Sequence, residues 1–341
     1  MMTFDAIGRQ AFEQNRAPGF AFLVSLGGRI IFAQGFGVAN IAANVPVTAD
    51  TRFSIGSLTK QFTAAAVLLL QENGELSLED TLESFVPGMP NGRRITLRML
   101  LNQTSGLHNF PNTREHSWPL AGVIRPNQLI RLLKTDKPDF APGEQWAYSN
   151  TNYAMLAEVI AEVSGISYGD FLLGRIFRPL GMERTSNGFF SQKEIATPYE
   201  WTGSAFAAVE PPLSLDLFYG AGSLISTAQD MSRWTNALMS NGLLKAESVR
   251  ELWLEGKLSS GKPVGYAMGF VPAMIGLHRH VWHNGYAPRA GGYCFQAIFP
   301  DDGLGIVVLS NASVASFRGV PEQIVREVLT LHDAQTEHPA E

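Results

Sequence analysis

Ser57 and Lys60 stand three positions apart at the start of an apolar run that continues to Leu70. Residues three apart on a helix share a face, so the serine hydroxyl and the lysine amine can meet there. A serine in a first helical turn also lies near backbone N–H groups that have no partner within the helix. The pair therefore offers a nucleophile, a base and donors for a developing oxyanion, which together are the chemistry of acyl transfer.

The same spacing occurs again at Ser259 and Lys262, but there a glycine and a following proline oppose helix formation. We therefore expect the second pair to lie in a solvated loop. The first pair leads into a run of alanine, valine and leucine that is typical of a buried helix. The surrounding sequence therefore favours Ser57 and Lys60 as the reactive pair. Taken without that sequence, Ser57 would also be explained as a helix cap, and Lys60 as a side chain that reaches solvent.

The composition is that of an ordinary globular protein. The chain has 341 residues, of which 45% are hydrophobic and 17% charged, with a net charge of −5. This length predicts two domains or one large domain. No basic stripe interleaved with aromatic residues indicates nucleic-acid binding. The longest apolar run, from Ala64 to Leu70, is far shorter than the ~20 residues that a membrane-spanning helix needs, so we expect no membrane span.

The N-terminal sequence and the cysteine content bear on the compartment. A single cysteine, Cys294, excludes an internal disulfide framework. The first residues lack the basic region and apolar core of a signal peptide. We therefore expect a cytoplasmic protein. An exported protein is the alternative, because its mature form also lacks a signal peptide.

Strand patterns occur at the two ends of the chain. A pair of glycines, Gly27 and Gly28, joins the first two strands and predicts a tight hairpin, because glycine reaches the positive φ angles that such turns demand. Strands joined by short links usually pair antiparallel, so we expect one antiparallel sheet assembled from both ends. The expected strands span 19–25, 29–34, 264–271, 278–283, 292–299 and 304–309, flanked by helices at 4–13 and 321–331.

The middle of the chain reads as helices and long loops. We therefore expect an α+β fold in which residues 1–77 and 257–341 form the sheet domain and residues 78–256 form an inserted, mostly helical domain. A cleft between two such regions is a common place for a small-molecule site. The helices expected in the insertion span 97–101, 127–133, 152–163, 168–177, 228–239 and 246–254.

A second segment with reactive side chains is Tyr148-Ser149-Asn150. It follows a turn-rich stretch and leads into a helix, so its side chains can project from a rigid loop into a cleft. A tyrosine hydroxyl and an asparagine amide supply a proton shuttle and hydrogen bonds in one short segment. A packed aromatic ring and a helix cap would explain the same residues taken alone.

A third segment, His283-Asn284-Gly285, lies at the end of an expected strand. A glycine beside a strand edge lets a ligand approach the backbone closely. If Tyr286 follows on an edge strand, its N–H can join that of Ser57 as the second of two oxyanion donors.

Together, and in this order, the three segments resemble the serine β-lactamase and penicillin-binding protein superfamily, in the class C β-lactamase-like branch that includes family VIII esterases and D-amino-acid peptidases. Ser57 and Lys60 match its SxxK motif, and Tyr148 and Asn150 match its YxN motif. His283 begins an HxG variant of its KTG motif. The resemblance covers about residues 17–331 and implies the two-region fold expected above. Further similar stretches are 100–107, 178–182, 220–227 and 265–270.

The resemblance implies a mechanism. Ser57 would attack a carbonyl to form an acyl-enzyme that water later hydrolyses, with Lys60 and Tyr148 sharing the proton transfers and no cofactor. Either Lys60 acts as a neutral amine, or a charged Lys60 holds Tyr148 as the phenolate base. Asn150 would bind the substrate amide or position Lys60.

His283, Gly285 and Tyr286 are implied to contact the substrate. Histidine is largely neutral at pH 7 where the lysine of KTG is charged, so we expect a weaker hold on a substrate carboxylate. We therefore expect a hydrolase of small esters with weak action on β-lactams. The alternatives are a D-amino-acid peptidase or amidase and a β-lactamase, so the partner is a small ester, amide or lactam.

Rival classes find less support. His278 and His280 would face one side of a strand and His283 the other, so the three histidines are not expected to bind one metal ion. HExxH is absent, and GxSxG occurs once, at Gly165–Gly169, where one expected helix ends and the next begins, rather than after a strand as a nucleophile elbow requires. A non-catalytic binding protein that keeps the fold remains an alternative, because a fold does not determine a function.

Overall fold

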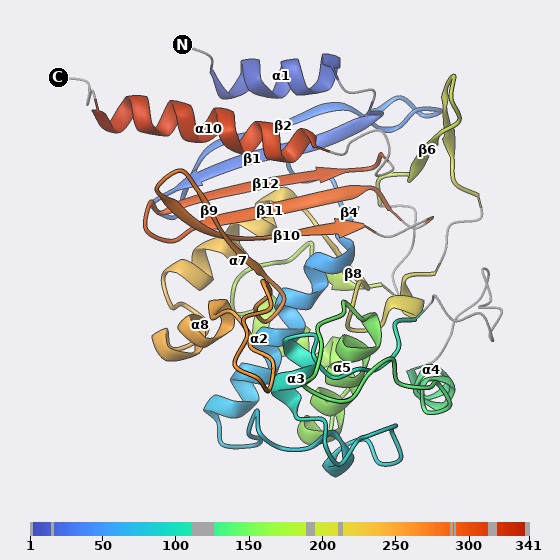
Figure 1. Cartoon of the computed structure of the whole chain (residues 1–341). Helices are drawn as coiled ribbons and strands as arrows, with labels where there is room; N and C mark the ends of the chain where they lie inside the picture. Colours follow the sequence, from blue (N-terminus) through green and yellow to red (C-terminus); the bar gives the residue numbers. More distant parts are fainter. Residues whose placement is uncertain are drawn as a thin grey trace.

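A computed structural model describes residues 3–14, 17–110, 126–188, 195–210, 214–286, 289, 291–312 and 319–337. The described residues form one large sheet of seven antiparallel strands in the order β3-β2-β1-β12-β11-β10-β9 (Figure 1). Both ends of the chain contribute strands, as predicted. The strands are β1 Gly19–Leu26, β2 Arg29–Asn40, β3 Val45–Pro46, β9 Val271–Ile275, β10 His278–Tyr286, β11 Tyr293–Phe299 and β12 Leu304–Ser310.

The conformation of glycine residues explains why one predicted turn is correct and one predicted strand is wrong. Gly27 and Gly28 both have positive φ and form the predicted turn between β1 and β2. The strand predicted at 264–271 is wrong, because residues 264–270 form a loop and β9 begins only at residue 271. Gly265 and Gly269 in that loop both have positive φ, which an extended strand does not accommodate.

Helices cover both faces of the sheet. α1 (Phe4–Gln14) and α10 (Val320–Glu337) lie together over one face, and α7 (Ala228–Met239) lies under the other (Figure 1). Side chains of β1 alternate between the two cores, with Phe20 packed on the side of α1 and α10 and Ala21 on the opposite side. The sheet is therefore buried on both faces, and the predicted terminal helices are confirmed.

The predicted helices of the middle section are present, with boundaries within about two residues. Four short strands also occur there, each of two or three residues and too brief to leave an alternating pattern in the sequence. The helices are α3 Leu97–Leu101, α4 Pro126–Leu133, α5 Asn150–Ser164, α6 Tyr168–Leu172, which continues as a π-helical turn Leu173–Phe177, and α8 Ala246–Trp253. The strands are β5 Ser186–Asn187, β6 Tyr199–Trp201, β7 Phe206–Ala208 and β8 Leu224–Ser226, and β8 also pairs with β4 (Phe53–Ser54).

The helix predicted after Ser57 is α2 (Thr59–Glu72), which is buried from Thr59 to Leu70. It packs against α5 and α8 and runs from the sheet into the helical section. The second pair, Ser259 and Lys262, is exposed in a loop, as predicted. Among the described helices, none combines the length and apolar character that crossing a membrane requires.

Candidate active site

Ser57 lies in the 3₁₀ turn Gly56–Leu58, which directly precedes α2 and packs against the end of β10. The contact between turn and strand is close enough to require glycine. A side chain at Gly285 would collide with the carbonyl oxygen of Ile55, and one at Gly291 would reach 2.7 Å from Cβ of Ser54. The glycine of the HxG segment therefore brings the serine turn onto the strand.

Four of the residues predicted for the site form one cluster, in which two side chains contact the Ser57 hydroxyl. The Tyr148 hydroxyl lies 2.7 Å from Ser57 Oγ, and Lys60 Nζ lies 3.2 Å from the same oxygen. Lys60 Nζ also lies 2.8 Å from Asn150 Oδ1 and 2.8 Å from the backbone oxygen of Ala221. The SxxK and YxN segments thus form one hydrogen-bonded cluster, although about ninety residues separate them in the sequence.

Lys60 is fully buried, and desolvation lowers its pKa well below the usual value for lysine. The two carbonyl oxygens on Nζ can each accept one hydrogen from a neutral amine. The remaining lone pair then faces the Ser57 hydroxyl at 3.2 Å. The geometry therefore suits a neutral Lys60 that accepts the proton of Ser57.

Tyr148 is suited to the opposite proton transfer. Desolvation raises its pKa above the usual value for tyrosine, and the hydrogen bond to Ser57 offsets this only in part. A neutral phenol donates its hydrogen to Ser57 Oγ across 2.7 Å. Burial thus shifts both groups toward their neutral forms, an amine at Lys60 and a phenol at Tyr148.

His283 is 4% exposed, and both of its ring nitrogens are engaged within the protein. Nδ1 lies 2.5 Å from the backbone oxygen of Asn284, which can only accept, so Nδ1 carries the hydrogen. Nε2 lies 3.1 Å from the Tyr266 hydroxyl and accepts from it. Burial lowers the pKa of His283 to about 4, so the ring is neutral at pH 7.

Tyr286 lies at the end of β10, where its backbone faces the serine turn. Tyr293 is the residue that pairs with Tyr286 on β11. Its N–H donates to the backbone oxygen of Ala312, on the side of β11 that faces away from β10. In an antiparallel pair the main-chain groups of a residue point to one side, so the N–H of Tyr286 points away from β11. A side chain at Gly56 would lie 2.6 Å from that nitrogen. The backbone nitrogen of Tyr286 therefore lies beside Gly56, the residue that precedes Ser57.

Sequence reasoning missed two groups of this cluster. Tyr266, which bonds to His283, falls within a stretch that was noted only as similar to the family. The Ala221 group that contacts Lys60 lies in the similar stretch 220–227, but it is a backbone carbonyl, which every residue type carries, so its residue type did not indicate the contact.

The remaining two histidines of the 278–283 segment have structural partners. His278 bridges Asp302 at 3.0 Å and Asp333 at 3.1 Å. His280 is buried and stacks on Phe299 with 4.9 Å between ring centroids. Within the part of the chain that the structure describes, no three His, Cys, Asp or Glu side chains form a group that could hold a metal ion.

Comparison with known proteins places the chain in a family. The family described as Beta-lactamase matches residues 4–329. The putative penicillin-binding protein PbpX of Bacillus subtilis is 32% identical over 286 residues, which are 83% of this chain and 67% of that protein. The chain spans 58% to 67% of the length of the curated relatives that it matches.

Solved structures agree in fold. A D-stereospecific amidohydrolase from Streptomyces sp. is 26% identical with a TM-score of 0.77, covering 94% of this chain and 97% of that one. The D-amino acid amidase from Ochrobactrum anthropi SV3, complexed with L-phenylalanine amide, has a TM-score of 0.84 at 24% identity, covering 96% and 97%. The chain therefore belongs to the β-lactamase family and has the β-lactamase and transpeptidase fold.

Proposed function

We propose that this protein hydrolyses small esters through an acyl-enzyme on Ser57, and that its preferred substrates carry no carboxylate on the leaving-group side. The observation that carries this proposal is the neutral, fully engaged ring of His283. At the position where the KTG motif places a charged lysine, this chain offers no positive charge at neutral pH.

The cluster supports a complete acyl transfer. Ser57 Oγ attacks the ester carbonyl and its proton passes to Lys60 Nζ, while the N–H groups of Ser57 and Tyr286 stabilise the oxyanion. As the C–O bond breaks, the Tyr148 hydroxyl protonates the departing alkoxide and recovers a proton from Lys60. Water then attacks the acyl group, Lys60 takes a proton from that water, and the acid leaves as the proton returns to Ser57.

Desolvation is the physical reason for the expected preference. A carboxylate that enters the site must give up its water shell, and only a cation or several donors can offset that cost. Lys60 is buried with a lowered pKa, and His283 is neutral. The nearby side chains are instead aromatic, since Trp146 is 40% exposed and lies 6.0 Å from the Tyr266 ring. Such a surface supports an uncharged, apolar leaving group.

Hydrolysis of D-amino-acid amides is a second candidate, favoured by the 26% identity to a D-stereospecific amidohydrolase over nearly the whole chain. The ammonia that leaves such an amide carries no carboxylate either. Asn150 has its Oδ1 on Lys60 and its Nδ2 on the Phe110 carbonyl. This supports the alternative in which Asn150 positions Lys60 over the one in which it binds the substrate amide.

Paired substrates test the proposal. Phenyl acetate and 3-carboxyphenyl acetate differ only in a carboxylate on the leaving group, and we expect kcat/KM to be at least ~10-fold higher for the first, equivalent to about 1.4 kcal/mol. D-phenylalanine amide, D-alanyl-D-alanine and nitrocefin complete the panel, with Ser57→Ala as the control. Equal rates on the two esters would refute the preference, and a Ser57→Ala variant as active as wild type would refute the mechanism. Faster turnover of the amide than of any ester would select the second candidate.

A further inference from the structure

The loop that carries Tyr148 is held on both sides by a single residue, Gln103. The backbone oxygen of Gln103 accepts from the N–H of Ala147 at 3.1 Å. Its side-chain Oε1 accepts from the N–H of Ser149 at 3.0 Å. The residues immediately before and after Tyr148 are therefore attached to one glutamine.

Gln103 itself is held in an unusual conformation. Its φ is +65°, in the left-handed region that costs non-glycine residues about 1 kcal/mol or more, and its side chain is fully buried. Oε1 also accepts from Asn152 Nδ2 at 2.6 Å, and Asn152 Oδ1 accepts from Ser105 at 2.5 Å. This network compensates the strained backbone and leaves the glutamine one orientation.

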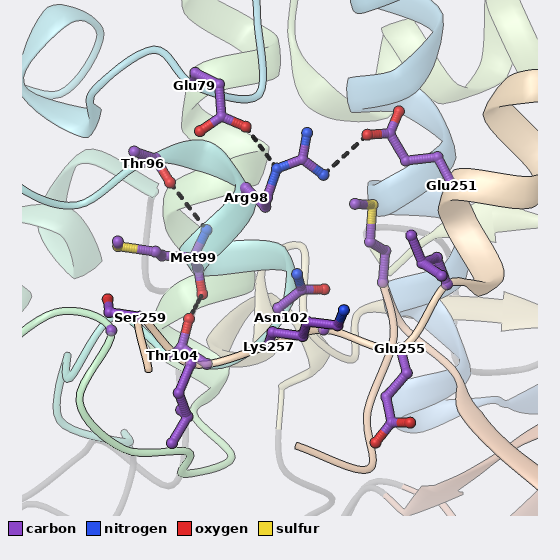
Figure 2. A pocket seen from close by; sticks show the side chains of 15 residues that line it. Glu79, Thr96, Arg98, Met99, Asn102, Thr104, Glu251, Glu255, Lys257 and Ser259 are labelled. Atoms are coloured by element: carbon purple, nitrogen blue, oxygen red, sulfur yellow. Dashed lines mark hydrogen bonds and ion pairs between the residues drawn. The ribbon is translucent and has the colours of Figure 1, made fainter. Parts of the chain in front are cut away.

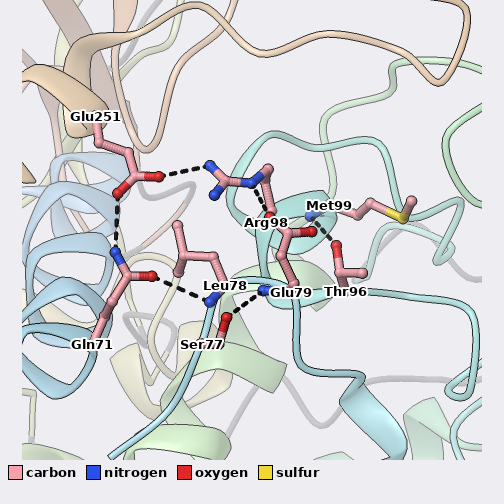
Figure 3. A network of polar contacts seen from close by, with 8 residues as sticks. All are labelled: Gln71, Ser77, Leu78, Glu79, Thr96, Arg98, Met99 and Glu251. Carbon is pink, nitrogen blue, oxygen red and sulfur yellow. Dashed lines mark hydrogen bonds and ion pairs between the residues drawn. The ribbon is translucent and has the colours of Figure 1, made fainter. Parts of the chain in front are cut away.

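The helix before Gln103 is anchored to the helix that carries Lys60. Arg98 of α3 contacts Glu79 at 2.6 Å and Glu251 at 2.9 Å. Glu251 accepts from Gln71, at the far end of α2, whose Oε1 accepts from the N–H of Leu78 (Figure 3). The two helices that position the base and the tyrosine loop are thus linked by one polar network.

Close packing and hydrogen bonds act together on the segment around Gln103. Asn102 and Thr104, on either side of it, are buried, although they line a cavity of about 340 Å³ together with Met99 and Glu255 (Figure 2). A side chain at Gly256 would lie 2.7 Å from Asn102 Cγ, so the segment is also held by close contacts. On the other side of Tyr148, Asn109 Oδ1 accepts from the N–H of Asn150 at 2.8 Å.

We propose that Gln103, assisted by Asn109, is a positioning residue that fixes the Tyr148 hydroxyl against Ser57. It touches neither the substrate nor the reacting atoms. Its effect is on the 2.7 Å contact between the two hydroxyls, and a displacement of about 1 Å at a reacting group can reduce the rate by ~10²-fold. The proposal rests on the proposed function, because it assumes that Tyr148 transfers a proton during ester hydrolysis.

The test replaces Gln103 by leucine, which has a similar size and bears similar backbone strain but accepts no hydrogen bond. We expect kcat on the best ester of the panel to fall ~10- to 100-fold while KM changes less than about threefold. Asn311→Leu is the matched control, since Asn311 is also buried and accepts a backbone N–H, but its bonds go to Gly19 and Val38 in the sheet rather than to the loop of Tyr148. The control is expected to keep wild-type kcat, with all assays run below the measured Tm of each variant.

A double-mutant cycle separates positioning from a general structural role. In a Tyr148→Phe background, adding Gln103→Leu is expected to reduce kcat by less than about threefold, because the group that it positions is already gone. Additive losses, or wild-type kcat in Gln103→Leu, would overturn the inference alone. Wild-type kcat in Tyr148→Phe would overturn both the inference and the role of Tyr148 in the proposed function. If Gln103→Leu does not fold, Asn109→Ala carries the same test with the same expectations.

Discussion

Lowering the pH should destabilise the folded protein, because His283 is buried as a neutral ring. The size of this loss follows from the difference between its pKa in the folded protein and in the unfolded chain. The folded ring has a pKa of about 4, against 6.5 for an unperturbed histidine. The unfolded chain therefore binds the proton more readily than the folded protein does. Stability contributed by the neutral ring is complete above pH 6.5 and is lost as the pH falls toward 4.

The expected magnitude follows from these two values. The difference between these two pKa values corresponds to about 3 kcal/mol at full protonation. The free energy of unfolding should thus drop by about 1 kcal/mol at pH 5.5 and by roughly 2 to 3 kcal/mol at pH 4.5, relative to pH 8. His283 is 4% exposed, so screening by solvent takes little from these values.

Urea unfolding of wild type and His283→Gln at pH 8, 5.5 and 4.5 measures this contribution. Carboxylates titrate in both proteins and cancel in the difference, so the variant should lose roughly 2 to 3 kcal/mol less than wild type between pH 8 and pH 4.5. An NMR titration of the His283 ring provides a direct readout. Parallel losses in the two proteins, or a titration midpoint near 6.5, would refute the neutral, buried histidine and with it the expected substrate preference.

Three further predictions concern the serine turn and its lysine. Lys60→Met should lower kcat by ~10²- to 10⁴-fold in steady-state ester assays, because it removes the group that accepts the serine proton; a smaller loss would contradict Lys60 as the base. Because the lowered pKa of Lys60 keeps the amine neutral, kcat/KM should be lost only as the pH falls through that lowered value, and an acidic limb near 10.5 in the pH–rate profile would speak against it. Gly285→Ala should destabilise the protein by at least ~2 kcal/mol in urea, since its methyl group meets the Ile55 carbonyl. Gly174→Ala, where nothing lies within 4 Å, is its control and should be close to neutral, so a similar cost in both variants would contradict the close contact of turn and strand.

Local patterns allowed much of the fold to be predicted. The apolar runs of the terminal strands and the helical pattern of residues 228–239 each depend on residues within one element, and α7 has the predicted bounds. The error at 264–271 arose because apolar residues there pack in a loop, where two glycines adopt conformations that a propensity argument does not detect. The short strands β5 and β8 depend on contacts with distant segments, which a single sequence does not display.

The site could be predicted to the same extent: its short motifs were found, and the contacts between distant segments were not. Ser57, Lys60, Tyr148, Asn150 and His283 were found from the sequence because each belongs to a short motif with a chemical reason for its residue types. The hydrogen bonds that decide their protonation are contacts between segments far apart in the sequence. The Tyr266 hydroxyl on His283 and the Gln103 oxygen on the Ser149 N–H are two such contacts; both residues lie in stretches similar to the family, but their partners could not be read from the sequence.

The central claim is that Ser57 carries the acyl group during turnover. The most direct measurement is the mass of the intact protein, followed by peptide mapping, after rapid acid quenching of a reaction with a p-nitrophenyl ester. We predict one acyl adduct on the peptide that contains Ser57 in the wild type, and neither adduct nor turnover in Ser57→Ala. Ester turnover by Ser57→Ala, or an adduct on a different residue in the wild type, would contradict the mechanism.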